Sequence, residues 1–382
     1  MKEWKTYKLG DIVNFTTGKL DSNAAEINGK YPFFTCSPET LKINSFAFNQ
    51  KAILLAGNNA EGNFSVKYYE GKFNAYQRTY VISISDENVV DYKFLYYALK
   101  ICLLRFKMMS QGTSTKFLTK SILNSFEIDL PNIETQQSIA SILASIDSKI
   151  QINRQINDNL EQQAQTLYKS WFVDFEPFKD GEFIESELGQ IPEGWQCIPF
   201  SMFVSESKAK TGKIGIKEYS VTNNGIFPRD AKYNKSLSQS STKNKLILYG
   251  DLVFGMSRDI LNWGVMQEEQ GGVSSAYTVY NINSGIVNST YLELFIKSRI
   301  HLFSDLIRPA AREGQGIDKS VLQIKVLLCP PQEVLDTFWP LYNSVTNQIQ
   351  TTTTEINCLG DVRDTLLPKL MSGELKINEI DC

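Results

Sequence analysis

Two polar loops of this chain carry the kinds of side chain that hydrogen-bond to bases and phosphates. They run Gln111-Gly-Thr-Ser-Thr-Lys116 and Arg312-Glu-Gly-Gln-Gly-Ile-Asp-Lys319. Arg, Lys, Gln, Ser and Thr donate to base edges and phosphate oxygens, and glycine lets a backbone approach a partner closely. A plain surface turn is the alternative interpretation. The DNA contacts predicted in these loops are Thr113, Ser114, Lys116, Arg312, Gln315 and Lys319.

Further candidates lie beside strand-like runs. Gln77 and Arg78 precede one such run, and Arg258 follows another. Lys243 and Lys245 belong to a Gln-Ser-Ser-Thr-Lys-Asn-Lys stretch. Each residue alone is equally compatible with a solvated surface, but as a set they predict nucleic-acid binding.

Motifs for catalysis and cofactor binding are missing. No Gly-Lys pair of the chain is followed by Ser or Thr, which excludes a P-loop, and no G-x-G-x-x-G follows a strand. The six cysteines form no metal-type pair, so we expect reduced, scattered thiols. The single histidine, His301, lies in an apolar run and is expected to be packed rather than catalytic. We predict no catalytic residue, no metal and no cofactor on this chain.

The composition is that of a folded protein long enough for two domains: 382 residues, 42% hydrophobic and 21% charged. The net charge of −3 is unevenly spread: +4 over 1–130, −5 over 131–185, +3 over 186–329 and −5 over 330–382. This alternation predicts mildly basic modules and acidic connecting segments, with chance as the alternative. Without an apolar leader or a membrane-length apolar stretch, we expect a cytoplasmic location and no membrane contact.

Two long segments, each opened by a proline after a strand-like run, predict long helices. Pro131 follows Phe126–Leu130, and Pro330 follows the equivalent run 199 residues later. The stretch from Glu134 to Lys169 has no Gly or Pro, whereas its counterpart contains Pro340. At 1.5 Å per residue the first helix would be about 54 Å long, or about one and a half turns of B-DNA at about 34 Å per turn.

Apolar residues recur every three or four positions along both segments, which predicts a coiled coil. Asn153, Asn157 and Thr352 interrupt this seam and are expected to set its register at some cost in stability, while Ile152 and Ile156 lie just off it. Two amphipathic helices, each packed on its own domain, are the alternative. The predicted coiled-coil and partner-binding positions are Ile139, Leu143, Ile146, Ile150, Leu160, Leu167, Phe338, Tyr342, Val345, Ile349, Ile356, Leu359 and Leu366.

The segments ahead of the helices predict two similar globular modules. Each opens on a tryptophan (Trp4, Trp195), contains short apolar runs between Gly- and Asn-rich turns, and has a helical stretch (92–109, 289–307) before its last strand. The predicted fold class is α+β with mixed or antiparallel strands, built as a pseudo-two-fold repeat. The expected boundaries are 1–130 and 195–329 for the modules, 131–175 and 330–382 for the helical spacers, and 176–194 for a linker.

The helical regions resemble those of a known family. The run Leu130-Pro131 through Gln136-Gln137 to Trp171-Phe-Val-Asp-Phe-Glu-Pro177 resembles the central conserved region of type I restriction-modification specificity subunits. Leu188-Gly-Gln-Ile-Pro-Glu-Gly-Trp195 and Leu366-Leu-Pro-Lys-Leu-Met-Ser-Gly-Glu-Leu375 resemble further signatures of that family. The resemblance covers the whole chain and is specific in the helices, while the modules diverge. The second helix departs from the pattern because it lacks the Gln-Gln/Ile-Ala motif and carries Pro340.

The resemblance implies that each module is a target-recognition domain for one half of a bipartite double-stranded DNA site, and that the helices form an antiparallel spacer. It implies two methyltransferase subunits as partners, which use S-adenosylmethionine to methylate adenine at N6. Two restriction subunits with ATP- and Mg-dependent translocase and nuclease activity can join them. Two other interpretations stay open: a stand-alone DNA methyltransferase or endonuclease with degenerate motifs, and a coiled-coil adaptor without a nucleic-acid role.

Overall fold

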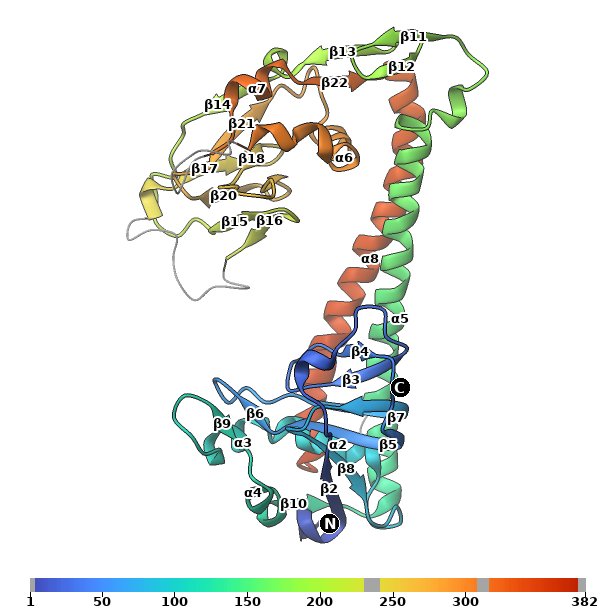
Figure 1. The fold of residues 1–382 in the computed structure, drawn as a ribbon, viewed down its shortest axis with the longest axis vertical. Coiled ribbons are helices and arrows are strands. Elements are labelled where there is room, and N and C mark those ends of the chain that lie inside the picture. Colours follow the sequence, from blue (N-terminus) through green and yellow to red (C-terminus); the bar gives the residue numbers. More distant parts are fainter. Residues whose placement is uncertain (1–3, 230–240, 308–315, 377–382) are drawn as a thin grey trace. The chain divides into compact units, whose positions relative to one another are not determined.

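The computed structural model describes residues 4–229, 241–307 and 316–376, and the chain divides into two compact units (Figure 1). Unit 1 comprises Met1–Asp158 and Ile349–Cys382, and unit 2 comprises Asn159–Gln348. The two 40-residue helices, α5 (Ile133–Phe172) and α8 (Gln332–Met371), each contribute to both units. Both confirm the predicted long helices, and α8 continues through Pro340.

Unit 1 is built on a six-stranded sheet of order β2-β8-β5-β7-β3-β4. All its pairings are antiparallel except that of β3 with β7. Side chains of a strand alternate between the two faces of a sheet, and both faces of β5 are buried, with Ile53 and Leu55 in one core cluster and Ala52 and Leu54 in another. The strands are β2 (Val13–Thr17), β3 (Tyr31–Phe34), β4 (Leu41–Ile43), β5 (Phe48–Ala56), β7 (Val66–Ala75) and β8 (Thr79–Ile84).

Helix α2 (Tyr92–Ile101) packs on β5 and β7 in unit 1. It begins where the Asp91 side chain accepts a hydrogen bond from the Phe94 N–H at 2.9 Å, an N-cap that satisfies a free donor of the first turn. The helical stretch predicted over 92–109 breaks at Cys102, after which α3 (Leu103–Met109) continues. The remaining elements are α1 (Leu9–Ile12), α4 (Lys120–Ser125), and the pairs β1 (Lys5–Lys8) with β10 (Glu127–Leu130) and β6 (Asn58–Asn59) with β9 (Lys116–Phe117).

The core of unit 1 takes in parts of both long helices. Ile139, Ala140 and Leu143 of α5 and Leu367 and Leu370 of α8 are buried in the same cluster as the helix-facing side of the sheet. The module preceding α5 therefore rests on the beginning of α5 and on the end of α8, as the blue, green and red ribbons of unit 1 show in Figure 1.

Unit 2 contains a four-stranded antiparallel sheet of order β14-β21-β18-β19, with four two-stranded pairs: β13-β22, β15-β16, β17-β20 and β11-β12. Its core cluster includes Tyr168 and Phe172 of α5 and Phe338 of α8. The strands are β11 (Phe183–Ser186), β12 (Gly189–Pro192), β13 (Gln196–Pro199), β14 (Val204–Ser207), β15 (Tyr219–Thr222), β16 (Gly225–Pro228), β17 (Lys245–Leu248), β18 (Leu252–Phe254), β19 (Trp263–Val265), β20 (Gln270–Val273), β21 (Thr278–Ile282) and β22 (Val326–Cys329). The helices are η2 (Glu176–Phe178), η3 (Phe200–Met202), η4 (Ser241–Lys243), α6 (Ser289–Ser298), η5 (Ile300–Leu306) and α7 (Lys319–Ile324).

The two modules begin and end with the same order of elements. A first strand after the tryptophan pairs antiparallel with the last strand before the long helix, as β1 with β10 and as β13 with β22. The Leu9 N–H donates to the Phe126 carbonyl at 2.8 Å, and the Phe200 N–H donates to the Lys325 carbonyl at 2.8 Å. The mixed helix and strand content confirms the α+β prediction.

Three local expectations differ from the structure. The segment expected as a linker folds into η2 and the β11–β12 hairpin, because Phe175 and Phe178 pack edge-on against Trp195. The apolar run 276–280 alone predicts a strand, whereas β21 begins and ends two residues later. The prediction that His301 is packed was wrong: His301 is exposed, since η5 turns Phe303 and Leu306 into the core instead.

Candidate nucleic-acid interface

A tight turn in unit 1 presents Gln77 and Arg78. The Thr79 N–H donates to the Tyr76 carbonyl at 2.9 Å, which closes a β-turn with Gln77 and Arg78, both exposed, at its central positions. The Gln77 N–H donates to the Leu20 carbonyl at 2.9 Å. The two side chains therefore project from an anchored backbone between β7 and β8.

The end of β5 supports this turn. The Gly57 N–H donates to the Arg78 carbonyl at 2.8 Å. A Cβ at Gly57 would lie 2.4 Å from that oxygen, so this close approach requires glycine. The Cys36 thiol also donates to the Arg78 carbonyl, at 3.4 Å. The Arg78 backbone is thus held from two sides while its side chain faces outward.

The first predicted loop is a short hairpin. Gln111 and Phe117 exchange both backbone hydrogen bonds, at 3.0 and 2.8 Å. Gly112 adopts a φ of 108°, and a Cβ there would lie 2.0 Å from the Thr115 carbonyl oxygen. The predicted residues Thr113 and Ser114 are exposed in this hairpin, and Lys116 is half-buried in β9. This geometry makes Gly112 a requirement of the hairpin.

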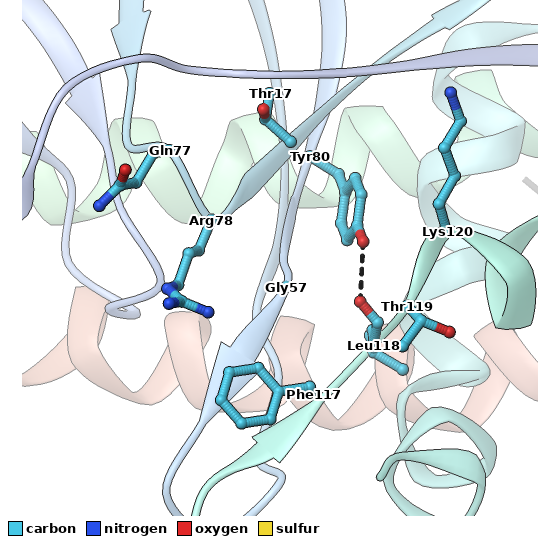
Figure 2. A pocket seen from close by; sticks show the side chains of 9 residues that line it. All are labelled: Thr17, Gly57, Gln77, Arg78, Tyr80, Phe117, Leu118, Thr119 and Lys120. Carbon is cyan, nitrogen blue, oxygen red and sulfur yellow. Dashed lines mark hydrogen bonds between the residues drawn. The ribbon is translucent and has the colours of Figure 1, made fainter. Parts of the chain in front are cut away.

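The turn and the hairpin meet at a pocket of about 450 Å³ (Figure 2). Figure 2 shows the Arg78 guanidinium directed at the Phe117 ring, and its carbon lies 5.4 Å from the ring centroid, within cation–π range. The Tyr80 hydroxyl donates to the Leu118 carbonyl at 2.8 Å and ties β8 to the segment after the hairpin. The pocket is lined by Thr17, Gly57, Gln77, Arg78, Tyr80, Phe117, Leu118, Thr119 and Lys120.

Unit 2 gathers lysines around one carboxylate. The Lys319 ammonium, at the start of α7, lies 2.5 Å from a Glu206 oxygen on β14. This hydrogen bond holds the pKa of Glu206 below its usual value, and the charges of Lys245 and Lys208 act in the same direction. Burial lowers the pKa of Lys245, whose ammonium also donates to the Tyr277 carbonyl at 2.5 Å. The predicted residues Lys245 and Lys319 therefore belong to one electrostatic cluster.

Other predicted residues are placed apart from these groups. Lys243 is exposed in η4, and Arg258 is exposed in the segment after β18. Arg312 and Gln315 lie outside the described residues. The pocket is not lined by Thr113 or Ser114.

Sequence reasoning missed Thr17, Phe117 and Lys120 in unit 1 and Lys208 in unit 2. One signal was available for Lys120, because the offset of 199 residues that relates the two prolines also relates Lys120 to Lys319. Both lysines follow an N-cap, Thr119 in α4 and Asp318 in α7. No sequence pattern marked Phe117, since its role depends on a contact with Arg78.

The long helices pair antiparallel in unit 1. Asp147 contacts Arg363, Asn153 contacts Glu355 at 2.9 Å, and Asn157 contacts Thr353 at 2.9 Å, so the order of partners runs in opposite directions along α5 and α8. Asn153 is 1% exposed, whereas Ile152 and Ile156 are 51% and 42% exposed and lie outside the seam.

In unit 2 the pairing of α5 and α8 is aromatic. The rings of Phe172 and Phe338 lie edge-on with centroids 4.6 Å apart, and Trp171 and Tyr168 contact Phe338 as well. Of the predicted seam positions on both helices, five are buried and the others half-buried. The buried ones are Ile139, Leu143, Ile150, Leu160 and Phe338, and the half-buried ones are Ile146, Leu167, Tyr342, Val345, Ile349, Ile356, Leu359 and Leu366.

The described part of the chain contains no group of three or more His, Cys, Asp or Glu residues arranged to hold a metal ion. Among these residues there is also no helix long and apolar enough to cross a membrane. Burial raises the pKa of Asp251, and this carboxylate accepts hydrogen bonds from the Leu248 N–H and the Asn281 amide, which is a structural role.

The comparisons with known proteins agree on one family. Residues 1–162 match the family model described as the type I restriction modification DNA specificity domain. The chain is 36% identical over 219 residues to the specificity subunit of the type I restriction enzyme EcoDI of Escherichia coli, covering 52% of this chain and 48% of that protein. It therefore spans about half the length of that relative. It is 28% identical over 315 residues to the MjaIX specificity subunit of Methanocaldococcus jannaschii, covering 78% and 72% of the two chains.

The fold of the whole chain has a counterpart among solved structures. The S subunit of a type I restriction-modification system from M. genitalium superposes with a TM-score of 0.60 over 96% of both chains at 16% identity. At that identity the likeness concerns the fold alone. The family model covers residues 1–162, and both relatives are specificity subunits of type I restriction enzymes, so this chain is similar in sequence to that class of proteins.

Proposed function

We propose that this chain is the DNA-reading subunit of a type I restriction-modification complex. In this proposal each module reads one half of a bipartite double-stranded site, and the subunit directs methylation of adenine at N6. The observation that carries the proposal is that two modules begin and end with the same order of elements, each with exposed cations ahead of its last strand. Cations on anchored loops suit contacts with phosphates and base edges.

The proposed DNA contacts differ in character between the two modules. In the first, the pocket presents Arg78, Gln77 and Lys120 next to the hairpin that carries Thr113 and Ser114. In the second, the lysines around Glu206 supply positive charge. Lys116, Lys243, Arg258, Arg312 and Gln315 remain proposed DNA contacts.

The two long helices are proposed to form the antiparallel spacer that fixes the distance between the half-sites and docks two methyltransferase subunits. The antiparallel contacts inside unit 1 and the aromatic contacts inside unit 2 support this proposal. S-adenosylmethionine would be bound by the methyltransferase subunits, and ATP and Mg by two restriction subunits that join the complex. The cytoplasm is the proposed location.

Exchange of one module tests independent reading. Residues 1–130 are replaced by the equivalent region of a relative, the chimera is expressed with its methyltransferase partner, and the methylated motif is determined by sequencing that detects N6-methyladenine. One half of the motif should change and the other half should stay. A change in both halves contradicts independent reading.

A second experiment separates the alternatives. The purified chain is incubated with S-adenosylmethionine and duplex DNA, with and without the methyltransferase subunit. Methyl transfer by the chain alone would establish a stand-alone enzyme. Absence of salt-dependent duplex binding, both alone and in the complex, would favour an adaptor, because counterion release accompanies contacts to phosphates.

A further inference from the structure

We infer that Arg78, held by Phe117, reads a guanine in the half-site of the first module. This inference rests on the proposed function and assigns one base to one side chain. A guanidinium in a fixed orientation donates two parallel hydrogen bonds to the O6 and N7 acceptors of guanine in the major groove, the commonest specific base contact. Three properties of Arg78 support the assignment.

The first property is an uncommitted charge. Arg78 is exposed, and its guanidinium makes no hydrogen bond or ion pair with any residue that the structure describes. Arg363 in the same unit is paired with Asp147 at 2.9 Å, and Arg299 of unit 2 donates to the Phe172 carbonyl at 2.7 Å. All the hydrogen-bond donors of Arg78 are therefore available to a ligand.

The second property is an anchored backbone at Arg78. The Arg78 carbonyl accepts from Gly57 and Cys36, and the flanking turn is closed by the bond from Thr79 to Tyr76. An anchored backbone reduces the conformational entropy that is lost when the side chain binds.

The third property is the aromatic ring that orients the guanidinium. Phe117 lies 5.4 Å from the Arg78 guanidinium carbon, and its own backbone is fixed by the paired bonds with Gln111 and by the pairing of β6 with β9. A guanidinium held beside a ring by a cation–π contact can still present its planar set of donors, whereas an ammonium is a point charge without such a planar edge. Phe117 is thus a positioning residue, and Arg78 is the reader.

The surroundings fit a base edge better than a lone phosphate. Gln77 lies beside Arg78 in the same turn, and its amide, which donates to an Asp21 carboxylate oxygen at 3.4 Å, has further capacity to pair with an adjacent base. Lys120 lines the same pocket and is exposed, which suits a phosphate contact flanking the base.

The test uses the chain expressed with its methyltransferase partner and compares the methylated motifs of wild type, Arg78→Ala, Arg78→Lys, Phe117→Leu and Phe117→Tyr. The matched control is Arg105→Ala, because Arg105 is also exposed and lies 4.5 Å from the ring centroid of Phe126 in the same unit. Thermal unfolding of each variant checks the fold.

Both Arg78 variants should lose the requirement for guanine at one position of one half-site, with discrimination falling about 5- to 140-fold, the range for one bidentate pair. The other half-site should be unchanged. Phe117→Leu should reduce discrimination at that same position. Phe117→Tyr should keep the wild-type discrimination because the aromatic ring is retained. Arg105→Ala should methylate the same motif as wild type.

Three outcomes overturn the inference while leaving the proposed function intact: a wild-type half-site without a G·C pair for the first module, an unchanged motif in both Arg78 variants, or uniformly weaker methylation of every site with an unchanged motif. The last result would identify a phosphate contact. If the wild-type complex methylates no bipartite motif, the proposed function itself fails.

Discussion

Arg363 of α8 and Asp147 of α5, 216 residues apart in the sequence, form an ion pair at 2.9 Å in unit 1. The other oxygen of Asp147 accepts a hydrogen bond from the Tyr97 hydroxyl of α2 at 2.8 Å. Burial and this hydrogen bond both raise the pKa of Tyr97 far above its usual value, so Tyr97 stays a donor. One carboxylate therefore connects the module to both long helices.

Replacing Arg363 with Ala should destabilise unit 1 by about 1–2 kcal/mol, because Asp147 is half-buried and would lose a charged donor. Denaturant unfolding of the variant and the wild type measures the difference. Lys51→Ala is the control, since the Lys51–Glu87 pair is mostly exposed and such pairs contribute little. Equal losses of unfolding free energy in Arg363→Ala and Lys51→Ala would contradict a special role for the Arg363–Asp147 pair.

Asn153 is buried in the seam, and its amide donates to Glu355. Asn153→Leu should raise the midpoint of thermal unfolding by about 2–4 °C, the effect of about 1 kcal/mol in a unit of this size. Because a polar seam residue restricts register, the variant should also methylate sites with more than one gap length. The control is Asn157→Leu, a less buried position on the same helix, which should change both readouts less. A lower midpoint of thermal unfolding, together with methylation of sites of a single gap length, would refute a role of Asn153 in setting the helix register.

Gly112→Ala should open the hairpin that carries Thr113 and Ser114, because the added Cβ would meet the Thr115 carbonyl and the φ of 108° is unfavourable for alanine. Hydrogen exchange of the Gln111 and Phe117 amides should accelerate, and DNA affinity should fall.

The control for the hairpin is Gly225→Ala, which has a similar φ of 112° but no atom within 4 Å of the added Cβ. This variant should leave exchange in the hairpin unchanged. If Gly112→Ala leaves the Gln111 and Phe117 amides as protected as in wild type, the hairpin does not depend on glycine.

Glu206→Gln should strengthen DNA binding by unit 2, because Lys319 would no longer be neutralised by its partner. Each additional phosphate contact should steepen the dependence of log affinity on log salt by about 0.9. Fluorescence anisotropy over a salt series gives both values. Glu268→Gln changes the net charge equally at the exposed Lys217 pair, so an equal gain there would point to net charge alone.

Acid should weaken the Glu206–Lys319 pair. The pKa of Glu206 is lower in the folded chain than its usual value, so the stabilisation from the pair is complete above the unfolded pKa of about 4.3 and is lost as pH falls through the folded value. Unfolding of wild type should therefore become more pH-dependent below about pH 4.3 than that of Glu206→Gln. If the stability of wild type and of Glu206→Gln changes with pH in the same way, the Glu206–Lys319 pair does not contribute to stability.

Several features of the site were beyond prediction because they depend on contacts between distant segments. Lys120 and Lys319 occupy equivalent positions of the repeat, yet Lys319 is paired with Glu206, 113 residues away, whereas Lys120 lines an open pocket. Arg78 is distinguished from a merely exposed arginine by Phe117, which the hairpin places beside it. Such differences in pairing decide which cations are available to a ligand.

The sequence by itself determined the α+β class and the two long helices with their opening prolines, because hydrophobic periodicity and X-Pro signals act over neighbouring residues. Its helical motifs also indicated the resemblance to type I specificity subunits, in agreement with the relatives that the chain matches. Only the tertiary structure decided that the segment before Trp195 is a hairpin, that His301 is exposed, and that Arg78 lies beside Phe117. These outcomes depend on packing and charge pairing between residues far apart in the chain, which local patterns do not encode.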